Sequence, residues 1–155
     1  MKATGIVRRI DDLGRIVIPR EIRRSLRIRE GDPLELYTQD GAIIFKKYSP
    51  IGDLGEQVIT IFKALREQIN MPCALYDRDN KLAGTKNKNF PESTPDDWVE
   101  SIRYSAVHIG EIYVTPILSD GDCIGFISYI IDKDDTSIHD LVRLTARTIS
   151  LLYNN

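Results

Sequence analysis

The apolar positions of the first fifty residues predict short strands around one short helix. Residues 4–10 and 15–18 are rich in β-branched and long apolar side chains, and Asp11-Asp12-Leu13-Gly14 between them is typical of a turn. Pro19 stands where it can open a helix, because proline suits the first helical position. That helix is predicted to run from Arg20 to about Leu26.

A β-hairpin is predicted to close this segment. Leu34–Thr38 and Ala42–Lys46 flank Asp40-Gly41, which is among the strongest short hairpin signals. Four short strands and one helix bury little core on their own. Either the segment packs against the rest of the chain or two copies fold together. Its apolar residues favour a small barrel shared by two chains. These residues are Ile6, Ile10, Ile16, Ile18, Leu34, Leu36 and Ile44.

Two longer helices are predicted further along the chain. From Asp53 to Asn70 the apolar residues recur at steps of three and four, and Pro72 ends the pattern. Ile138–Tyr153 is apolar around most of its circumference, so this helix needs partners on two sides, its own sheet and another chain. We therefore expect both helices to mediate oligomerisation. The residues expected at these contacts are Leu54, Val58, Ile61, Leu65, Ile138, Leu141, Ile149 and Leu152.

Strands alternate with a helix between these two segments. The predicted strands are 73–76, 81–84, 112–118 and 123–130. A polar loop covers residues 85–93, and Thr94 is expected to cap a helix that follows it. The last two strands form a hairpin around Asp120-Gly121. The pattern predicts an α+β protein with an N-terminal domain at 1–50, a linking and dimerising helix at 51–71 and a compact domain at 72–155.

Charge is distributed unevenly between these parts. Residues 1–50 hold 11 Lys and Arg against 7 Asp and Glu, whereas the remainder holds 10 against 16. A wheel drawn for the short helix places four arginines within a sector of about 100°, opposite Ile22 and Leu26. This arginine stripe consists of Arg20, Arg23, Arg24 and Arg27. Solvated helix faces normally interleave acids with bases, and here only Glu21 intervenes. The stripe therefore predicts contact with a polyanion.

The sequence lacks the motifs of several other function classes. It has no glycine-rich phosphate loop, no nucleophile elbow and no Cys/His cluster at metal-ligand spacing, so neither an enzyme nor a cofactor is expected. Cys73 and Cys123 lie in apolar stretches and are predicted to be buried reduced thiols. His108 and His139 are not expected to be metal ligands. With no signal peptide and no apolar run of about 20 residues, a cytoplasmic protein without membrane contact is expected.

The N-terminal segment resembles a known family. The stretch from Thr4-Gly5-Ile6-Val7-Arg8 through Leu13-Gly14-Arg15-Ile16-Val17-Ile18-Pro19 to Leu26, and on through Lys46-Lys47-Tyr48-Ser49-Pro50, is similar to the N-terminal domain of the AbrB family of transition-state regulators. The resemblance implies that two chains interlace their strands in a swapped-hairpin barrel that binds double-stranded DNA. It further implies a transcription regulator at the nucleoid, acting on sporulation genes.

The resemblance also implies which side chains contact DNA. The principal contacts implied are Arg8, Arg15, Arg23 and Arg24. The helical wheel independently selects the last two, with Arg20 and Arg27 beside them. Supporting contacts to phosphate are expected from Lys2, Arg9, Lys46 and Lys47. Arginine suits this task because its planar fork holds a phosphate or a guanine edge through two hydrogen bonds.

A looser resemblance covers the C-terminal part. Thr115-Pro116-Ile117, the Asp120-Gly121 turn and Ile124-Gly125-Phe126-Ile127 resemble the last strands of a GAF domain. The segment between Gly84 and Gly110 is shorter than in a full GAF domain, which reduces the room for a ligand. The resemblance thus implies an α/β GAF-like domain with an antiparallel sheet that joins two DNA-binding dimers into a tetramer. The sequence leaves open dimer or tetramer, and whether a small molecule binds.

Two other functions are weighed against a DNA-binding regulator. Swapped-hairpin domains also occur in antitoxins, which bind a partner toxin through their tails. Such tails are short and disordered, whereas residues 53–155 are patterned like a folded domain. The second alternative, a sensor whose ligand alters DNA affinity, is compatible with a DNA-binding regulator. The operator and the direction of regulation are left open by the sequence.

Overall fold

A computed structural model describes residues 4–102, 105–132 and 135–154 of the chain. The chain divides into two compact units, Met1–Tyr48 and Ser49–Asn155. Each unit has its own local hydrogen bonding. Among the described residues, none of the helices is both long and apolar enough to cross a membrane.

The first unit contains one short helix and one hairpin. Helix α1 spans Arg20–Ser25, and strands β1 (Leu34–Gln39) and β2 (Ala42–Lys47) pair antiparallel, as the sequence predicts. Gln39 faces Ala42 across the turn, where Asp40 and Gly41 both have positive φ, +49° and +75°. Two positive φ angles in a two-residue loop are those of a type I′ turn, whose twist matches that of the strands.

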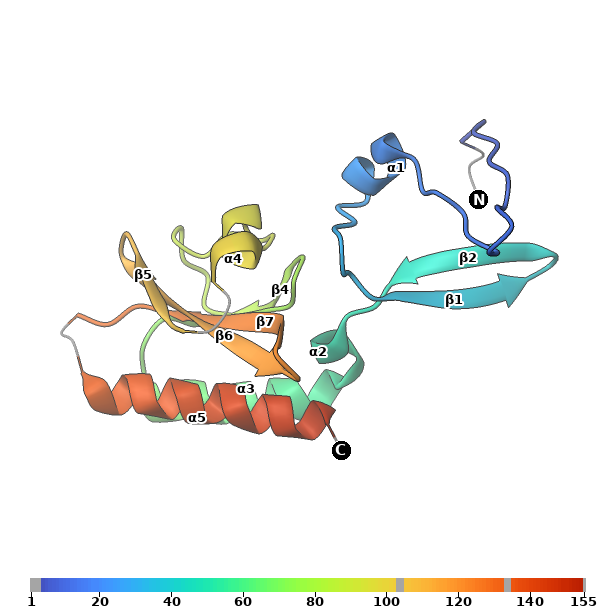
Figure 1. Cartoon of the computed structure of the whole chain (residues 1–155). Helices are drawn as coiled ribbons and strands as arrows, with labels where there is room; N and C mark the ends of the chain where they lie inside the picture. Colours follow the sequence, from blue (N-terminus) through green and yellow to red (C-terminus); the bar gives the residue numbers. More distant parts are fainter. Residues whose placement is uncertain (1–3, 103–104, 133–134, 155) are drawn as a thin grey trace. The chain divides into compact units, whose positions relative to one another are not determined.

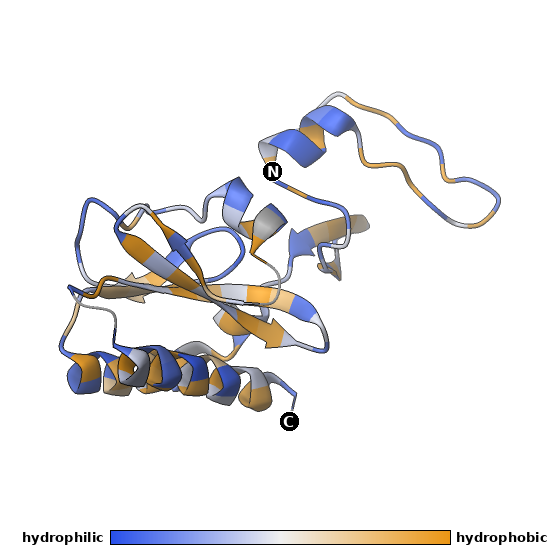
Figure 2. Cartoon of the chain, turned by 60° about the vertical axis from the view of Figure 1, so that its left-hand side comes forward, coloured by the Kyte–Doolittle hydropathy of each residue, from blue (hydrophilic) through white to orange (hydrophobic). Residues whose placement is uncertain are grey.

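The strands expected at residues 4–10 and 15–18 are not formed. The turn between them is present, but the residues on both sides of it run as extended chain without a paired strand. Hydrophobic residues continue along this extended chain (Figure 2), and Val7 is 88% exposed. A β-strand requires hydrogen bonds to a neighbouring strand, and within a single chain these residues have none to pair with.

The second unit is built on a five-stranded antiparallel sheet. Its spatial order is β4-β3-β7-β6-β5. The strands are β3 (Cys73–Tyr76), β4 (Lys81–Gly84), β5 (Val107–Ile109), β6 (Ile112–Ser119) and β7 (Asp122–Tyr129). Four of them match strands expected from the sequence. The short strand β5 was not expected, because three residues are too few to show an alternating pattern.

Helices cover both faces of this sheet. Helices α3 (Gly55–Ile69) and α5 (Thr136–Tyr153) lie side by side on one face, and α4 (Asp96–Ser101) lies on the other (Figure 1). The short helix α2 (Pro50–Asp53) precedes α3. The sequence predicted one helix from Asp53, and the break arises at Gly55, whose φ of +50° is not helical.

Each face of the sheet therefore has its own core. On the side of α3 and α5, the fully buried side chains include Phe62, Leu75 and Ile127. On the side of α4, Tyr76, Trp98 and Phe126 pack edge to face, with ring centroids 5.2 and 5.9 Å apart along the series. Successive residues of one strand, such as Leu75 and Tyr76, lie in opposite cores, as the pleat of a strand requires.

Burial corrects the expected oligomerisation set. Val58, Leu65 and Ile149 are buried in the core that their own chain forms, so they cannot also face a second chain. Four others are partly buried and pack against that same core, and Leu152 is partly buried too: the four are Leu54, Ile61, Ile138 and Leu141. The large apolar residues that α5 leaves exposed are Leu144, at 63%, and Leu151, at 49%. Sequence periodicity identifies an apolar face but not which partner covers it.

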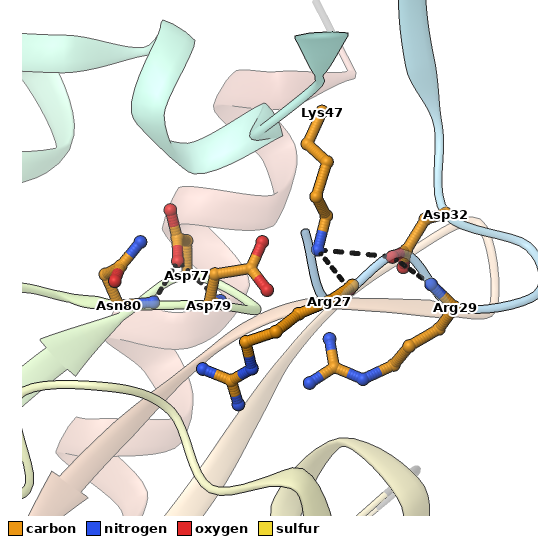
Figure 3. Close-up of polar contacts among 7 residues, drawn as sticks. All are labelled: Arg27, Arg29, Asp32, Lys47, Asp77, Asp79 and Asn80. Atoms are coloured by element: carbon orange, nitrogen blue, oxygen red, sulfur yellow. Dashed lines mark hydrogen bonds and ion pairs between the residues drawn. The ribbon is translucent and has the colours of Figure 1, made fainter. Parts of the chain in front are cut away.

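A hydrogen-bonded loop marks the start of the second unit. The Ser49 hydroxyl donates to Asp77 Oδ2 over 2.9 Å and accepts from the Gly52 N–H at the start of α2. Asp77 Oδ1 accepts from the backbone N–H groups of Asp79 and Asn80, each over 2.7 Å (Figure 3). These contacts join the first residue of the unit to the turn between β3 and β4.

Thr94 does not cap helix α4, contrary to the expectation from sequence. Its buried hydroxyl instead donates to the backbone oxygen of Asp77 over 2.8 Å, and Pro95 occupies the N-cap position without a side-chain hydrogen bond. A threonine hydroxyl can satisfy a loop carbonyl as readily as a helix N–H. The local sequence could not distinguish these two uses.

Both cysteines are free thiols and both histidines contact tyrosine side chains. Burial raises the pKa of Cys73 and of Cys123 to about 11, which keeps them protonated. His108 stacks on Tyr113 at 4.2 Å, and His139 Nδ1 lies 2.7 Å from the Tyr129 hydroxyl oxygen. Within the described residues, no group of three or more His, Cys, Asp and Glu side chains could hold a metal ion.

The burial of Ile149 leads to a stability prediction. We expect Ile149→Ala to lower the free energy of unfolding by about 2–5 kcal/mol, because it removes a fully buried side chain and leaves a cavity. Thr148→Ala, at the exposed neighbouring position, should change it by less than about 0.5 kcal/mol. Urea unfolding followed by circular dichroism measures both. Equal effects of the two substitutions would contradict the placement of Ile149 in the core.

Candidate nucleic-acid interface

The turn at Asp11–Gly14 is organised by one carboxylate. Asp11 Oδ1 accepts from the backbone N–H groups of Leu13 and Arg15, over 3.0 and 2.8 Å. The backbones of Asp11 and Arg15 are joined by a further hydrogen bond of 3.0 Å. This arrangement reverses the chain at Gly14, whose φ is +75°, and brings the segments on either side of the turn alongside each other at its base.

Arg15 directly follows this turn, and its side chain lies largely in solvent. Its Nε donates to Asp11 Oδ2 over 2.8 Å, and the side chain is 69% exposed. The backbone and side-chain hydrogen bonds from Arg15 hold the pKa of the Asp11 carboxyl below its ordinary value of 3.8. Arg8 and Arg9 are exposed in the segment before the turn. The ion pair orients the Arg15 guanidinium while leaving most of it accessible.

Helix α1 presents three members of the arginine stripe. Arg20, Arg23 and Arg24 are exposed, and the only acid in the helix is Glu21. The opposite face is less anchored than expected: Ile22 is half-buried, but Leu26 is 56% exposed. The helix thus gathers positive charge on one side and leaves apolar surface uncovered on the other.

Arg27 does not belong to the helical face on which the wheel placed it. The helix ends at Ser25, and Arg27 adopts a left-handed conformation with φ of +51°. The Ile28 N–H donates to the Arg23 oxygen over 2.7 Å and the Arg27 N–H to the Arg24 oxygen over 3.2 Å. These two bonds define a Schellman motif, in which the left-handed position is usually glycine. Arg27 is therefore part of the helix terminus.

Lys47 is held by a local network rather than standing free. Its Nζ lies 3.2 Å from Asp32 Oδ2 and donates to the Arg27 backbone oxygen over 2.8 Å (Figure 3). Asp32 Oδ2 also accepts from the Arg29 N–H over 2.8 Å. Lys47 thereby ties the end of β2 to the segment after α1. Lys46, its neighbour, is exposed, and Lys2 lies outside the described residues.

Two residues of this site were missed by the sequence analysis. Asp11 organises the turn and orients Arg15, and Asp32 anchors Lys47. A signal existed for the first, since an aspartate at the start of a turn commonly accepts hydrogen bonds from backbone groups that follow it. The second depends on β2 returning beside residues 27–32, which no local pattern reveals.

The first unit leaves its apolar residues uncovered. None of the described residues 4–48 is buried. Its exposed large hydrophobic residues are Ile6, Val7, Ile10, Leu13, Ile16, Val17, Leu26, Leu36, Tyr37, Ile43 and Phe45. Soluble monomers seldom expose large apolar patches, which are typical of interaction sites.

Comparison with known proteins identifies the family. Stage V sporulation protein T of Bacillus subtilis (strain 168) is 41% identical over 157 aligned positions, which cover 88% of each chain. The chain belongs to the SpoVT family. Within the AbrB family, the whole sequence is predicted to be most similar to the stage V sporulation regulator. The comparison confirms this similarity.

The N-terminal part of this SpoVT-family chain is also similar to other proteins. Transition state regulatory protein AbrB of the same organism is 62% identical over 50 residues, which are 32% of this chain and 52% of AbrB, so the match spans about half of that relative. A solved N-terminal DNA recognition domain of AbrB covers 31% of this chain, with 91% of its own length matched and a TM-score of 0.27. The family described as "Antidote-toxin recognition MazE, bacterial antitoxin" matches residues 7–53.

The second unit of the SpoVT-family chain has a more distant structural neighbour. The GAF domain of PixJ from Thermosynechococcus elongatus is 17% identical, with 69% of this chain and 88% of that domain covered and a TM-score of 0.48. The chain combines the mixed α+β elements expected from its sequence, an AbrB-like segment followed by an antiparallel-sheet domain.

The geometry at Asp11 predicts how its carboxyl titrates. A lowered pKa in the folded protein means that the turn is stabilised above about pH 4 and loses this stabilisation as the pH falls through the lowered value. Arg15→Gln should raise the pKa of Asp11 only partway to its ordinary value, because the larger cause, the backbone hydrogen bond, remains. Carbon-13 NMR titration of the Asp11 carboxyl measures this. A complete return to the ordinary value would show that the side chain is the main cause.

Proposed function

We propose that the chain is a DNA-binding transcription regulator of sporulation genes, acting in the cytoplasm at the nucleoid. The observation that carries this proposal is the set of exposed arginines in the very segment that is 62% identical to AbrB. That relative is a transition state regulatory protein, and the solved domain of AbrB is its DNA recognition domain. Family membership with stage V sporulation protein T supports the sporulation context.

The proposed contacts come from two elements of the first unit. Arg8 and Arg15 flank the turn, and Arg23 and Arg24 project from α1. Arg9, Arg20 and Lys46 are exposed and would support them through phosphate contacts. Since the arginines have few polar base-reading neighbours, most of the affinity is electrostatic, and DNA shape contributes to specificity.

The DNA-binding form is proposed to contain two chains. The first unit buries none of its described residues, and its two extended segments lack paired strands. A second copy that supplied the missing strands would cover the apolar residues on both chains at once, as in a swapped-hairpin barrel. Lys47 and Asp32 would then hold each hairpin against its own α1, and Arg27 would contribute its backbone more than its charge.

The second unit is proposed to join two such dimers. Leu144 and Leu151 lie seven residues apart on α5, so they share one face of the helix and are both exposed. We assign this unit a GAF-like oligomerising role. The face of the sheet beneath α4 is filled by Tyr76, Trp98 and Phe126, which favours oligomerisation over ligand sensing at that face.

An antitoxin role fits the chain less well. The antitoxin family matches less than a third of the chain, at residues 7–53. The remaining residues form a sheet covered on both faces by helices, rather than a short tail that would order on a toxin. A folded second unit favours the regulator.

Salt dependence provides the decisive measurement for DNA binding. If four arginines per chain each neutralise a phosphate, a dimer makes about eight contacts, and the logarithm of affinity should fall against the logarithm of salt concentration with a slope near −7. Arg23→Ala/Arg24→Ala removes about half of these contacts, so the slope should become about −4. Fluorescence anisotropy of a labelled duplex, titrated at several salt concentrations, measures both slopes.

The matched control is Lys63→Ala/Arg66→Ala, which removes the same charge from exposed positions of α3 in the second unit. This variant should keep the slope of the unaltered protein. A slope near −2 for the unaltered protein, or equal binding by both double variants, would reject the arginine surface and move attention to protein partners.

The proposed tetramer can be tested on α5. Leu144→Asp should halve the molar mass measured by light scattering, because a charge on an exposed contact residue opposes association without entering the core. Deletion of α5 would not serve, since Val142, Ala146 and Ile149 belong to the core. Lys63→Asp, an exposed position on α3, is the control and should leave the mass unchanged. An unchanged mass for Leu144→Asp would reject this face as the interface.

A further inference from the structure

The sheet of the second unit has an edge that is only half covered. Strand β5 pairs with β6 through Ile112–Val114, and among the described residues Thr115–Ser119 of β6 pairs with β7 alone. Exposed N–H and C=O groups at a sheet edge can accept another strand, so proteins usually cover, charge or interrupt such edges. On the side away from β7, the second half of β6 therefore has no paired strand among the described residues. Thr115, Ile117 and Ser119 are buried, and Leu118 is partly exposed.

A groove of about 320 Å³ lies along this unpaired edge. The lining includes Thr115, Pro116 and Leu118 of β6 and Arg143, Ala146 and Arg147 of α5. One wall is the edge of β6 and the other is α5. At the end of the strand, the Ser119 hydroxyl donates to Asn154 Oδ1 over 2.5 Å, which ties β6 to the end of α5.

The groove is positively charged in an otherwise acidic unit. Residues 51–155 carry 10 Lys and Arg against 16 Asp and Glu, yet the lining contains two arginines and no acid. Arg143 is 65% exposed and only loosely paired with Asp140 on its own helix, at 3.6 Å. Within the part of the chain that the structure describes, Arg147 has no ion-pair partner. The charge of this groove therefore suits an acidic ligand.

The spacing of the two arginines suits a strand. Residues four apart on a helix, such as Arg143 and Arg147, have Cβ atoms about 5–6 Å apart. Alternate residues of a β-strand share one face and lie about 6.6 Å apart. Carboxylates at alternate positions of an added strand would face both arginines, while its backbone met the edge of β6.

We propose that this groove binds an extended acidic segment of another protein, in which acidic residues alternate with apolar ones. Pro116 has no N–H and so removes one donor from the edge, which limits pairing to a short segment. Two copies of this chain meeting edge to edge would bring four arginines together, so a second copy is the poorer occupant. The inference is independent of DNA binding by the first unit. Arg147 lies between Leu144 and Leu151 along α5, so the groove borders the proposed tetramer contact.

A short fluorescein-labelled peptide of alternating valine and glutamate tests the proposal on the full-length protein by fluorescence anisotropy. The peptide should bind, and Arg143→Gln/Arg147→Gln should weaken binding about tenfold, since each exposed ion pair contributes a factor of about 2–5. Lys63→Gln/Arg66→Gln, an exposed basic pair on α3, should leave it unchanged. A peptide with lysine in place of glutamate should not bind.

Three results would overturn the proposal. The first is no binding of the glutamate peptide by the unaltered protein, and the second is equal binding by both double variants. The third is a fall in molar mass for Arg143→Gln/Arg147→Gln, which would make the groove a contact between copies. Circular dichroism confirms that each variant is folded. The DNA affinity of Arg143→Gln/Arg147→Gln is measured as well. It shows whether a loss of peptide binding is separate from DNA binding by the arginine stripe.

Discussion

The main constraint on this chain is that its first unit has more apolar surface than a single copy can cover. None of the described residues 4–48 is buried, although the segment is rich in isoleucine, leucine and valine. Local hydrogen bonds still organise it: Asp11 shapes a turn, a Schellman motif ends α1, and Lys47 fixes the hairpin to the segment after the helix. These bonds orient the arginine-bearing segments, but they leave the apolar residues of the unit exposed.

The second unit covers its apolar side chains within one chain. Its sheet has an aliphatic core on the side of α3 and α5 and an aromatic core on the side of α4. Two covered faces leave few apolar side chains in solvent, and on α5 these are Leu144 and Leu151. The second unit therefore has a core of its own within one chain, whereas none of the described residues 4–48 of the first unit is buried.

The sequence predicted the elements that local patterns determine. The hairpin at Asp40-Gly41, the four longer strands of the second unit and helix α5 are all visible in periodicity and turn residues. What it could not predict depends on contacts distant in sequence. The burial of Ile149 in its own core, the use of Thr94 by the Asp77 carbonyl and the pairing of Lys47 with Asp32 all require the folded chain. For the candidate site, Arg23 and Arg24 follow from the wheel, but Arg27 does not, because the helix ends before it.

The boundary at Tyr48 and Ser49 has a consequence for how such chains arise. The Tyr48 N–H donates to the Pro33 oxygen in the first unit, and the Ser49 hydroxyl donates to Asp77 in the second. Each side of one peptide bond is thus fixed by hydrogen bonds within its own unit. A recombination event at this point would exchange one unit and leave those bonds of the other intact. The likeness to AbrB, confined to about fifty residues at 62% identity, is the pattern that such modular exchange would leave in a genome.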